Sequence, residues 1–363
     1  MALEPRPDGI VLAGLQGSAQ SPKLAFFDKL PADDPLHRDP ESFGEALKPF
    51  VEQAGAEGAP AATLLYRSEI NLILTEAPDV DRNEWREALK WRVRDLLDFP
   101  VERAVIDAFP VGLEAPGEGP QAFVVAARSD RVRNRVTAAH AAGLDLRYVD
   151  IPDMAHRNLA RLLPEPAYGT CLVILDEQSP LISITKGGEL CFSRQVGMDI
   201  GEELGRLASE LGVDADEARR QRVEEGLAAA AVSDGGQLAG PEPEELALEE
   251  ELAGGTDAGP PQALTDFADR LALEIQRSLD YYDSRFRQAA IQKIYLGGEG
   301  ARIQGLEAYL EEALGIEFEF FHPLDHMEAD GGIAQQRQEV GFPIHEGVLA
   351  IGAGLRMLDP DFA

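Results

Sequence analysis

The chain has 363 residues, of which 65 are acidic and 33 are basic, so its formal net charge is −32. This charge argues against nucleic-acid binding, because phosphates would be repelled rather than neutralised. Hydrophobic residues make up 44% of the chain, enough for the cores of two or three lobes. No apolar run reaches the roughly 20 residues that span a bilayer, and no signal peptide opens the chain. We therefore expect a cytoplasmic protein.

Three short apolar runs open the chain and predict a meander of strands. They cover 2–4, 9–15 and 23–27, and Gly, Pro, Asp and Ser residues separate them, as turns require. The rest of the first half alternates between helix and strand patterns. The predicted helices are 43–53, 80–97, 129–142 and 153–162, and the predicted strands are 62–66, 70–74, 104–111, 121–127 and 145–149.

The meander pattern returns after the Pro164-Glu165-Pro166 segment. Apolar runs at 170–175, 181–185 and 189–196 are again separated by turn residues. Two similar meanders, each followed by helices and further strands, predict an internal duplication into two α/β lobes of related build.

Cysteine and histidine residues give no metal-binding pattern. Cys171 and Cys191 lie inside apolar runs, so we expect buried, reduced thiols rather than ligands or a disulfide. His322 and His326 have a metal-like spacing, but Pro323 between them argues against a shared helical face. No metal site is expected.

The region from Gly201 to Arg287 is mostly helical in pattern. Asp214, three residues before Glu217, predicts the capped start of a helix at 215–225. The segment 234–262 has eight acidic residues and no basic ones, with many Gly and Pro, and predicts a disordered acidic insertion. An interaction tail is the alternative. A long amphipathic helix is predicted at 264–287, with one apolar face made of Phe267, Leu271, Ile275, Leu279 and Tyr282.

A glycine-rich turn follows the next apolar run. The strand pattern at 291–296 leads directly into Gly297, Gly298 and Gly300, and a helical pattern begins at Leu306. Glycines at a strand-to-helix turn allow the backbone to approach a ligand closely, and a helix N-terminus favours negative charge. The turn therefore resembles half of a nucleotide site. A last helical segment with many small residues is predicted at 344–356.

Several segments in this order resemble the actin-like ATPase superfamily. Within it, the match is to the PilM group of pilus-assembly proteins, and specifically to the MshI branch from mannose-sensitive haemagglutinin (MSHA) pilus systems. The segments that carry the resemblance are 87–91, 98–102, 125–128, 188–194, 212–218, 274–282, 296–306 and 347–356.

The resemblance implies an α/β protein with the actin-like ATPase fold, two RNase H-like lobes around a cleft. The first lobe would cover 1–165, with an inserted subdomain at about 78–143. The second would cover 166–363, with a helical subdomain at about 201–287 that contains the acidic insertion at about 234–262.

The resemblance also implies a partner. PilM-like proteins are cytoplasmic and capture the N-terminal tail of a single-span inner-membrane protein of the PilN type. The tail lies in a groove between the first lobe and its inserted subdomain. In this chain we expect an apolar, exposed groove near Trp91 and Leu96. Core packing is the alternative for Trp91.

Both phosphate loops depart from the family pattern. Members that bind ATP carry Asp-x-Gly at the first hairpin of each lobe, to hold hydrated magnesium and approach the phosphates. The first loop here reads Leu-Glu-Pro-Arg-Pro at 3–7, and proline removes a backbone donor. In the second loop, Ile174 stands where the family has its acid and Asp176 where it has glycine.

The nucleoside side of the site is better preserved. Glu274 and Arg277 on the long helix, with Gly297, Gly298 and Gly300, match positions that face the nucleoside in relatives. Alternatively, Glu274 and Arg277 form an i,i+3 surface pair and the glycines allow close packing.

We therefore expect a pseudo-ATPase that acts as a scaffold and requires no cofactor. Its expected role is in biogenesis of an MSHA-type pilus, recruited to the inner membrane by a PilN-like partner. The alternatives are an active ATP-binding enzyme of the same superfamily, or the cytoplasmic part of a type II secretion protein of the GspL type.

Overall fold

The structure is a computed structural model of the chain. It describes residues 1–6, 8–31, 39–176, 180–227, 259–287, 290–336 and 343–358, without the side chains of 334–336 and 343. The predicted acidic insertion lies outside the described residues, except for 259–262. Among the described residues, no helix is long and apolar enough to cross a bilayer.

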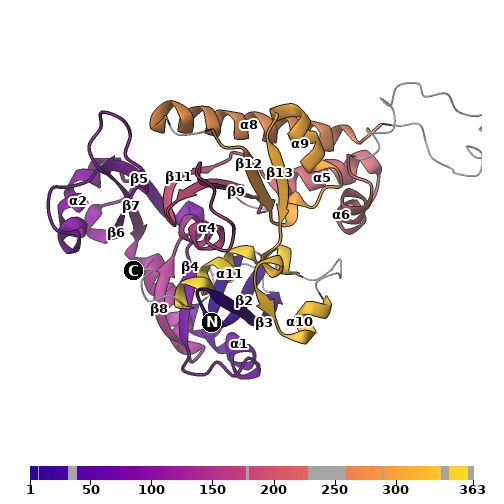
Figure 1. Cartoon of the computed structure of the whole chain (residues 1–363). Coiled ribbons are helices and arrows are strands. Elements are labelled where there is room, and N and C mark those ends of the chain that lie inside the picture. Colours follow the sequence, from indigo (N-terminus) through magenta and orange to yellow (C-terminus); the bar gives the residue numbers. More distant parts are fainter. Residues whose placement is uncertain are drawn as a thin grey trace, which may run out of the picture.

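The first lobe is built on a six-stranded sheet (Figure 1). Its first three strands form the predicted antiparallel meander, and two further strands then pair in parallel. The first strand runs through Arg6, so it is longer than the predicted 2–4. The strands are β1 (Ala2–Arg6), β2 (Gly9–Ser18), β3 (Ser21–Pro31), β4 (Pro60–Leu64), β8 (Asp145–Asp150) and β14 (Glu328–Ala329), in the order β14-β3-β2-β1-β4-β8.

Helices cover both faces of this sheet. On one face, α1 (Pro40–Gln53) and α3 (Ser129–Ala141) pack against each other and against the sheet. On the other face, α4 (Pro152–Ala160) packs against α11 (Val348–Leu355), and the Asn158 amide donates to the Gly352 carbonyl at 2.9 Å. The range 166–363 therefore contains residues of both lobes, because its C-terminal part returns to the first sheet.

An inserted subdomain carries its own three-stranded antiparallel sheet, in the order β5-β7-β6. Its strands are β5 (Ile70–Glu76), β6 (Ala104–Pro110) and β7 (Gln121–Arg128). Helix α2 (Trp85–Val93) packs on one face through Trp85, Leu89 and Val93, which contact Ala122 and Val124 of β7. The helix is shorter than the predicted 80–97, because single 3-10 turns flank it at Arg82–Glu84 and Arg94–Leu96.

The second lobe repeats the arrangement of the first. An antiparallel meander again begins the sheet, and two parallel strands extend it from the meander's first strand. The strands are β9 (Thr170–Ile174), β10 (Leu181–Lys186), β11 (Glu189–Gln195), β12 (Lys293–Gly297) and β13 (Glu317–Phe321), in the order β11-β10-β9-β12-β13. The equivalent order in the first sheet is β3-β2-β1-β4-β8, which confirms the predicted duplication.

Among the described residues, the helices of the second lobe are α5 (Ile200–Leu211), α6 (Ala215–Glu224), α8 (Gln262–Phe286) and α9 (Leu306–Leu314). Figure 1 shows α8 running along the second lobe, with α5 and α6 near its beginning. The predicted apolar face of α8 is buried, and Asp214 caps α6 by accepting from the Glu217 amide at 2.9 Å. Cys171 and Cys191 are buried free thiols, as predicted. A short helix, α10 (Gly331–Gln336), lies near the first sheet.

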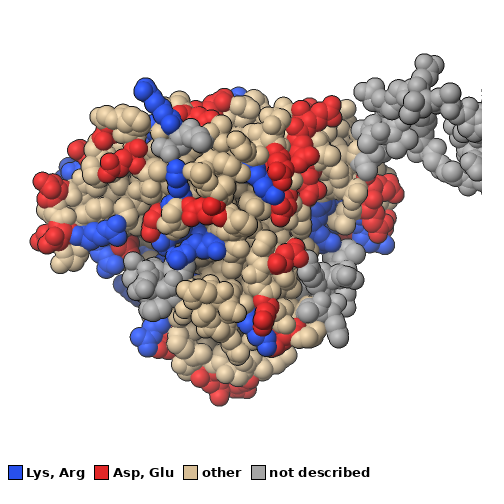
Figure 2. Space-filling view, in the orientation of Figure 1, with Lys and Arg blue, Asp and Glu red and all other residues tan. Residues whose placement is uncertain are grey.

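Acidic side chains are spread over the face of the molecule that Figure 2 shows. Figure 2 shows Asp and Glu side chains across one face of the molecule, with Lys and Arg interleaved among them. This distribution provides no continuous basic surface on that face for a nucleic-acid backbone.

Candidate functional site

The glycine turn at the end of β12 packs tightly against the chain itself. Gly298 has φ +90°, a conformation that side chains rarely adopt. A Cβ atom on Gly298 would lie 2.8 Å from the Leu175 carbonyl oxygen, and one on Gly300 would lie 2.9 Å from both the Cβ and the oxygen of Leu175. The Gly300 amide donates to the same carbonyl at 2.9 Å. The glycines therefore bring the turn against the end of β9.

Glu299, within this turn, is a buried acid that the sequence analysis missed. Its carboxylate accepts from the guanidinium of Arg222 at 3.2 Å and lies 3.7 Å from that of Arg219, both on α6. Arg302 completes the cluster at 3.3 Å. These ion pairs fix the turn to the helical subdomain. The signal in the sequence was the position of Glu299 between two glycines of a tightly packed turn. A carboxylate buried in such a turn requires basic partners.

Glu274 joins α8 to the edge strand β11 and also pairs with Arg277 on its own helix. The Arg277 guanidinium donates to Glu274 at 2.8 Å, which is the i,i+3 pair considered from the sequence. Arg194 of β11 donates to the other oxygen of Glu274 at 2.6 Å and to the Ser278 hydroxyl at 3.2 Å. The structure thus places Glu274 and Arg277 against β11, whereas the predicted glycines pack against β9.

Arg6 occupies the junction between the two lobes. Its guanidinium Nη1 donates to the Asp176 carboxylate at 2.8 Å, to the Glu4 carboxylate at 3.1 Å and to the Glu346 carbonyl at 2.6 Å. The Arg6 side chain is almost fully buried. Burial disfavours its charge, but Asp176 and Glu4 raise the pKa of Arg6 above its ordinary value. One guanidinium therefore joins the end of β1, the end of β9 and the segment before α11.

Glu4 connects this cluster to the last helix. One carboxylate oxygen accepts from Arg6, and the other accepts from the Ala350 amide in the first turn of α11 at 2.8 Å. A negative charge at a helix N-terminus is stabilising. Burial nevertheless raises the pKa of Glu4 to about 8, against the lowering effect of Arg6. Glu4 and Arg6 lie on the same side of β1, because strand side chains alternate.

The cavities beside the junction and the glycine turn are small. One lies between the lobes, is lined by the ends of β1 and β4 with Arg67, Pro152 and Asp176, and encloses about 50 Å³. Another lies under the glycine turn, between α5, α6 and α8, and encloses about 10 Å³. Pockets that bury small molecules typically enclose roughly 300–1,000 Å³.

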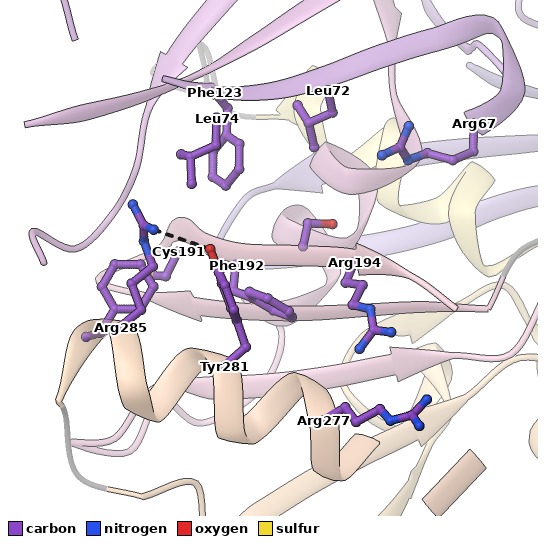
Figure 3. A pocket seen from close by; sticks show the side chains of 12 residues that line it. Arg67, Leu72, Leu74, Phe123, Cys191, Phe192, Arg194, Arg277, Tyr281 and Arg285 are labelled. Atoms are coloured by element: carbon purple, nitrogen blue, oxygen red, sulfur yellow. Dashed lines mark hydrogen bonds between the residues drawn. The ribbon is translucent and has the colours of Figure 1, made fainter. Parts of the chain in front are cut away.

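A larger cavity of about 420 Å³ lies between the inserted subdomain and the second lobe. Figure 3 shows apolar side chains from β5 and β7 on one side and side chains of β11 and α8 on the other. The sequence analysis missed this site, apart from Arg277. Its lining includes the apolar residues Leu72, Leu74, Phe123, Phe192, Tyr281 and Phe286 and the basic residues Arg67, Arg194, Arg277 and Arg285.

The two residues predicted at a partner groove are both on the surface. Trp91 is 55% exposed on the outer face of α2, and Leu96 is 62% exposed in the following 3-10 turn. The opposite face of α2 is the buried one, so Trp91 is not a core residue. The Lys90 ammonium lies 5.8 Å from the centre of the Trp91 ring. Neither Trp91 nor Leu96 lines the three cavities described above.

Among the residues that the structure places, no group of three or more His, Cys, Asp or Glu side chains is arranged to hold a metal ion. The acidic groups at the lobe junction, Glu4 and Asp176, are instead paired with Arg6.

Known structures resemble this chain over most of its length. A structure described as the PilM-PilN type IV pilus biogenesis complex is 20% identical, covers 99% of this chain and 98% of its own, and has a TM-score of 0.71. Ethanolamine utilization protein EutJ from Carboxydothermus hydrogenoformans is 14% identical. The match covers 98% of this chain and 88% of EutJ, with a TM-score of 0.49. A Bacteroides thetaiotaomicron protein of unknown function with an actin-like ATPase fold is 7% identical. The match covers 89% of this chain and 90% of that protein, with a TM-score of 0.40.

The TM-score of 0.71 to the PilM-PilN structure, together with the equivalent strand order of the two sheets, confirms the predicted actin-like ATPase fold. In addition, a family model described as type IV pilus assembly protein PilM matches residues 59–234 and 257–358, which is more than half of the chain. The two matched ranges cover most of both lobes and leave out the meander at the beginning of the chain. The chain belongs to the PilM family of type IV pilus assembly proteins.

Proposed function

We propose that this protein is a cytoplasmic scaffold for biogenesis of an MSHA-type pilus, and that it binds the cytoplasmic tail of a PilN-like inner-membrane protein. The observation that carries the proposal is the full-length similarity to the PilM-PilN complex, together with membership of the PilM family. Binding of a membrane-anchored tail would recruit the protein to the inner face of the membrane.

The exposed side chains of Trp91 and Leu96 are our candidates for the tail-binding surface. Both project from the inserted subdomain, where α2 packs its other side onto the sheet. Large apolar side chains this exposed stabilise a folded protein little, and aromatic residues dominate many binding surfaces. A tail with apolar side chains could dock there as an extended strand or as a helix.

Binding of the tail tests this proposal directly. A synthetic peptide with the cytoplasmic N-terminal residues of the PilN-like protein from the same organism is titrated into the full chain by calorimetry. We expect the peptide to bind the unaltered chain. We expect it to bind Trp91→Ala and Leu96→Ala at least about tenfold more weakly. Leu273→Ala on α8 is the matched control, since Leu273 is also exposed but lies on another subdomain. No binding of the peptide to the unaltered chain would overturn the proposal.

We further propose that the scaffold does not hydrolyse ATP. In this fold, magnesium and ATP phosphates would lie between the two hairpins that Arg6 joins. The residues there do not fit that ligand. The Arg6 guanidinium is bonded to Asp176 and Glu4, Pro5 offers no amide donor, and the cavity between the lobes encloses about 50 Å³.

The glycine turn supports the same conclusion. The Gly300 amide, a candidate donor to a ligand, is bonded to Leu175, and Glu299 is paired with the arginines of α6. The glycines are required for packing of the turn against β9, which explains their presence without a nucleotide. Arg6 joins the two lobes where a nucleotide would otherwise bridge them.

A further inference from the structure

The middle of the 420 Å³ cavity is apolar and open to solvent. Leu74 of β5 is 37% exposed and Tyr281 of α8 is 47% exposed, and they belong to a small set of large apolar side chains that are this exposed among the described residues. Figure 3 shows Leu74 and Phe123 on one side of the cavity and Phe192 and Tyr281 on the other. The Phe192 and Tyr281 rings lie 5.8 Å apart. Apolar surface between two subdomains, bordered by polar residues, is typical of a binding site.

Arginine side chains lie at both ends of this apolar region. Figure 3 shows Arg285 at one end and Arg67, Arg194 and Arg277 toward the other. Guanidinium groups bind carboxylates in a bidentate geometry and are favoured where acidic groups are recognised.

At the Arg194 end of the cavity, the arginines outnumber the carboxylates with which they pair. Among the residues that the structure describes, Arg194 and Arg277 share the carboxylate of Glu274, so their pairing leaves one positive charge in excess. Arg67 forms an ion pair with Asp153, whose oxygen lies 3.7 Å from the guanidinium, beyond hydrogen-bond distance. At the other end Arg285 is bonded to Glu118 at 2.9 Å, to Gln121 and to the Tyr281 hydroxyl at 3.3 Å. Four arginines line this cavity although the chain has a net charge of −32, so its basic lining contrasts with the acidic composition of the chain.

The spacing along α8 sets the length of the ligand. Arg277, Tyr281 and Arg285 follow one another at intervals of four residues, so they share one face of the helix. A helix rises 1.5 Å per residue, so about 12 Å separates the first of these positions from the last. An extended peptide advances about 3.3 Å per residue. About four residues would therefore reach from one basic end of the cavity to the other.

We propose that this cavity binds an extended segment of a partner protein in which acidic residues flank two or more apolar residues. The apolar side chains would lie between Leu74 and Tyr281, and the flanking carboxylates would meet the arginines at the two ends. Arginines at separate ends favour such a segment over a single phosphate group, which would contact one end alone. The site goes beyond the proposed tail binding, because it contains neither Trp91 nor Leu96.

Designed peptides test the inference in the full chain. The probe is a fluorescein-labelled peptide with the sequence Asp-Glu-Leu-Phe-Glu-Asp, and binding is measured by fluorescence anisotropy. One control has Lys at the four acidic positions, and another has Ser and Gly in place of Leu and Phe. We expect the probe to bind and each control to bind about tenfold or more weakly, since both the charge and the apolar contact would be required.

Matched substitutions locate the binding. Tyr281→Ser and Arg277→Ser change solvent-exposed side chains of the cavity, and we expect each to weaken probe binding about tenfold. Leu273→Ser on the same helix and Arg206→Ser on α5 change side chains of similar exposure elsewhere and should leave it unchanged. Circular dichroism confirms that each variant is folded.

The inference is overturned if the probe does not bind, if the lysine peptide binds equally well, or if cavity and control variants behave alike. The PilN-like tail is measured with the same variants. Its affinity should be unchanged in Tyr281→Ser and reduced in Trp91→Ala, so the two proposals succeed or fail separately.

Discussion

The guanidinium of Arg6 donates a 2.8 Å hydrogen bond to the carboxylate of Asp176, although 170 residues separate them along the chain. Arg6 ends β1 and Asp176 follows β9, which are the equivalent first strands of the two duplicated lobes. The pair therefore joins the lobes at their corresponding hairpins. Because both side chains are largely buried, loss of one partner leaves the other charge without compensation.

Replacing Arg6 by alanine should strongly destabilise the protein. The change removes the shared partner of the buried carboxylates Glu4 and Asp176, and breaking a buried pair in this way costs about 3–5 kcal/mol. Urea denaturation followed by circular dichroism measures the change in the free energy of unfolding. Arg206→Ala, which removes an exposed pair with Glu202, should cost about 0–1 kcal/mol. Equal effects of the two changes would show that Arg6 does not hold the lobes.

The fold was largely predictable because its signals are local. Alternating apolar runs between turn residues identified both meanders, and the four-residue spacing of Phe267, Leu271, Ile275 and Leu279 identified α8 and its buried face. The return of α11 to the first lobe was not predicted, since an apolar helix rich in small residues can pack against either sheet. Only the three-dimensional arrangement places Gly352 against α4.

Gly300→Ala should destabilise the protein. The added methyl group would lie 2.9 Å from the Leu175 backbone oxygen and 3.0 Å from the Ile200 side chain, so the turn and β9 would have to separate. Inserting a methyl group into such a packed site costs about 1–3 kcal/mol.

Gly205→Ala is the control for this change, because open space surrounds Gly205 within helix α5. Alanine there should stabilise the protein by about 0.5–1 kcal/mol, since glycine is a poor helix former. Thermal unfolding of the two variants should therefore shift in opposite directions. A neutral Gly300→Ala would show that the turn has room on this side.

The functional residues were harder to predict than the fold, because the contacts that define them join distant segments. Arg6 was expected in a turn, and its buried partners come from β9 and from the segment before α11. The signal in the sequence was the two-residue spacing of Glu4 and Arg6, which places both side chains on the same side of a strand. The large cavity draws on β5, β7, β11 and α8, so no single motif contains it.

Stability should depend on pH through His156. This side chain is buried in α4, its Nδ1 atom lies 3.0 Å from the Ser183 hydroxyl, and burial lowers its pKa to about 3. The unfolded chain takes up a proton near pH 6.5, whereas the folded protein does not. The contribution of His156 is therefore present above pH 6.5 and is lost as the pH falls toward 3, by at most about 1.4 kcal/mol per pH unit.

Comparison with a variant separates the effect of His156 on stability from that of the many carboxylates that also titrate in this pH range. His156→Asn keeps a polar atom near Nδ1 but does not titrate. The free energy of unfolding of the unaltered protein minus that of the variant should fall by about 1 kcal/mol between pH 7.5 and pH 5.5. A constant difference for His156→Asn would show that this histidine takes up its proton as readily in the folded protein as in the unfolded chain.

Magnesium-ATP should not stabilise the protein. A ligand that binds only the folded state at 100 times its Kd adds about 2.7 kcal/mol of stability. If ATP bound with a Kd of about 10 µM, 1 mM magnesium-ATP would therefore raise the melting temperature by several degrees. We expect no shift, because Arg6 is bonded to Asp176 and Glu4 where the phosphates would lie, and the Gly300 amide is bonded to Leu175.

The measurement is differential scanning fluorimetry with and without 1 mM magnesium-ATP, followed by calorimetric titration of the nucleotide. Magnesium with sulfate at equal ionic strength controls for general salt effects on a chain of net charge −32. Low-micromolar binding would remove the structural basis of the proposed loss of ATPase activity, which is that the site does not fit the nucleotide. It would also require the Arg6–Asp176 pair to separate, because the cavity beside that pair encloses about 50 Å³. The pair and bound nucleotide are therefore expected to be mutually exclusive.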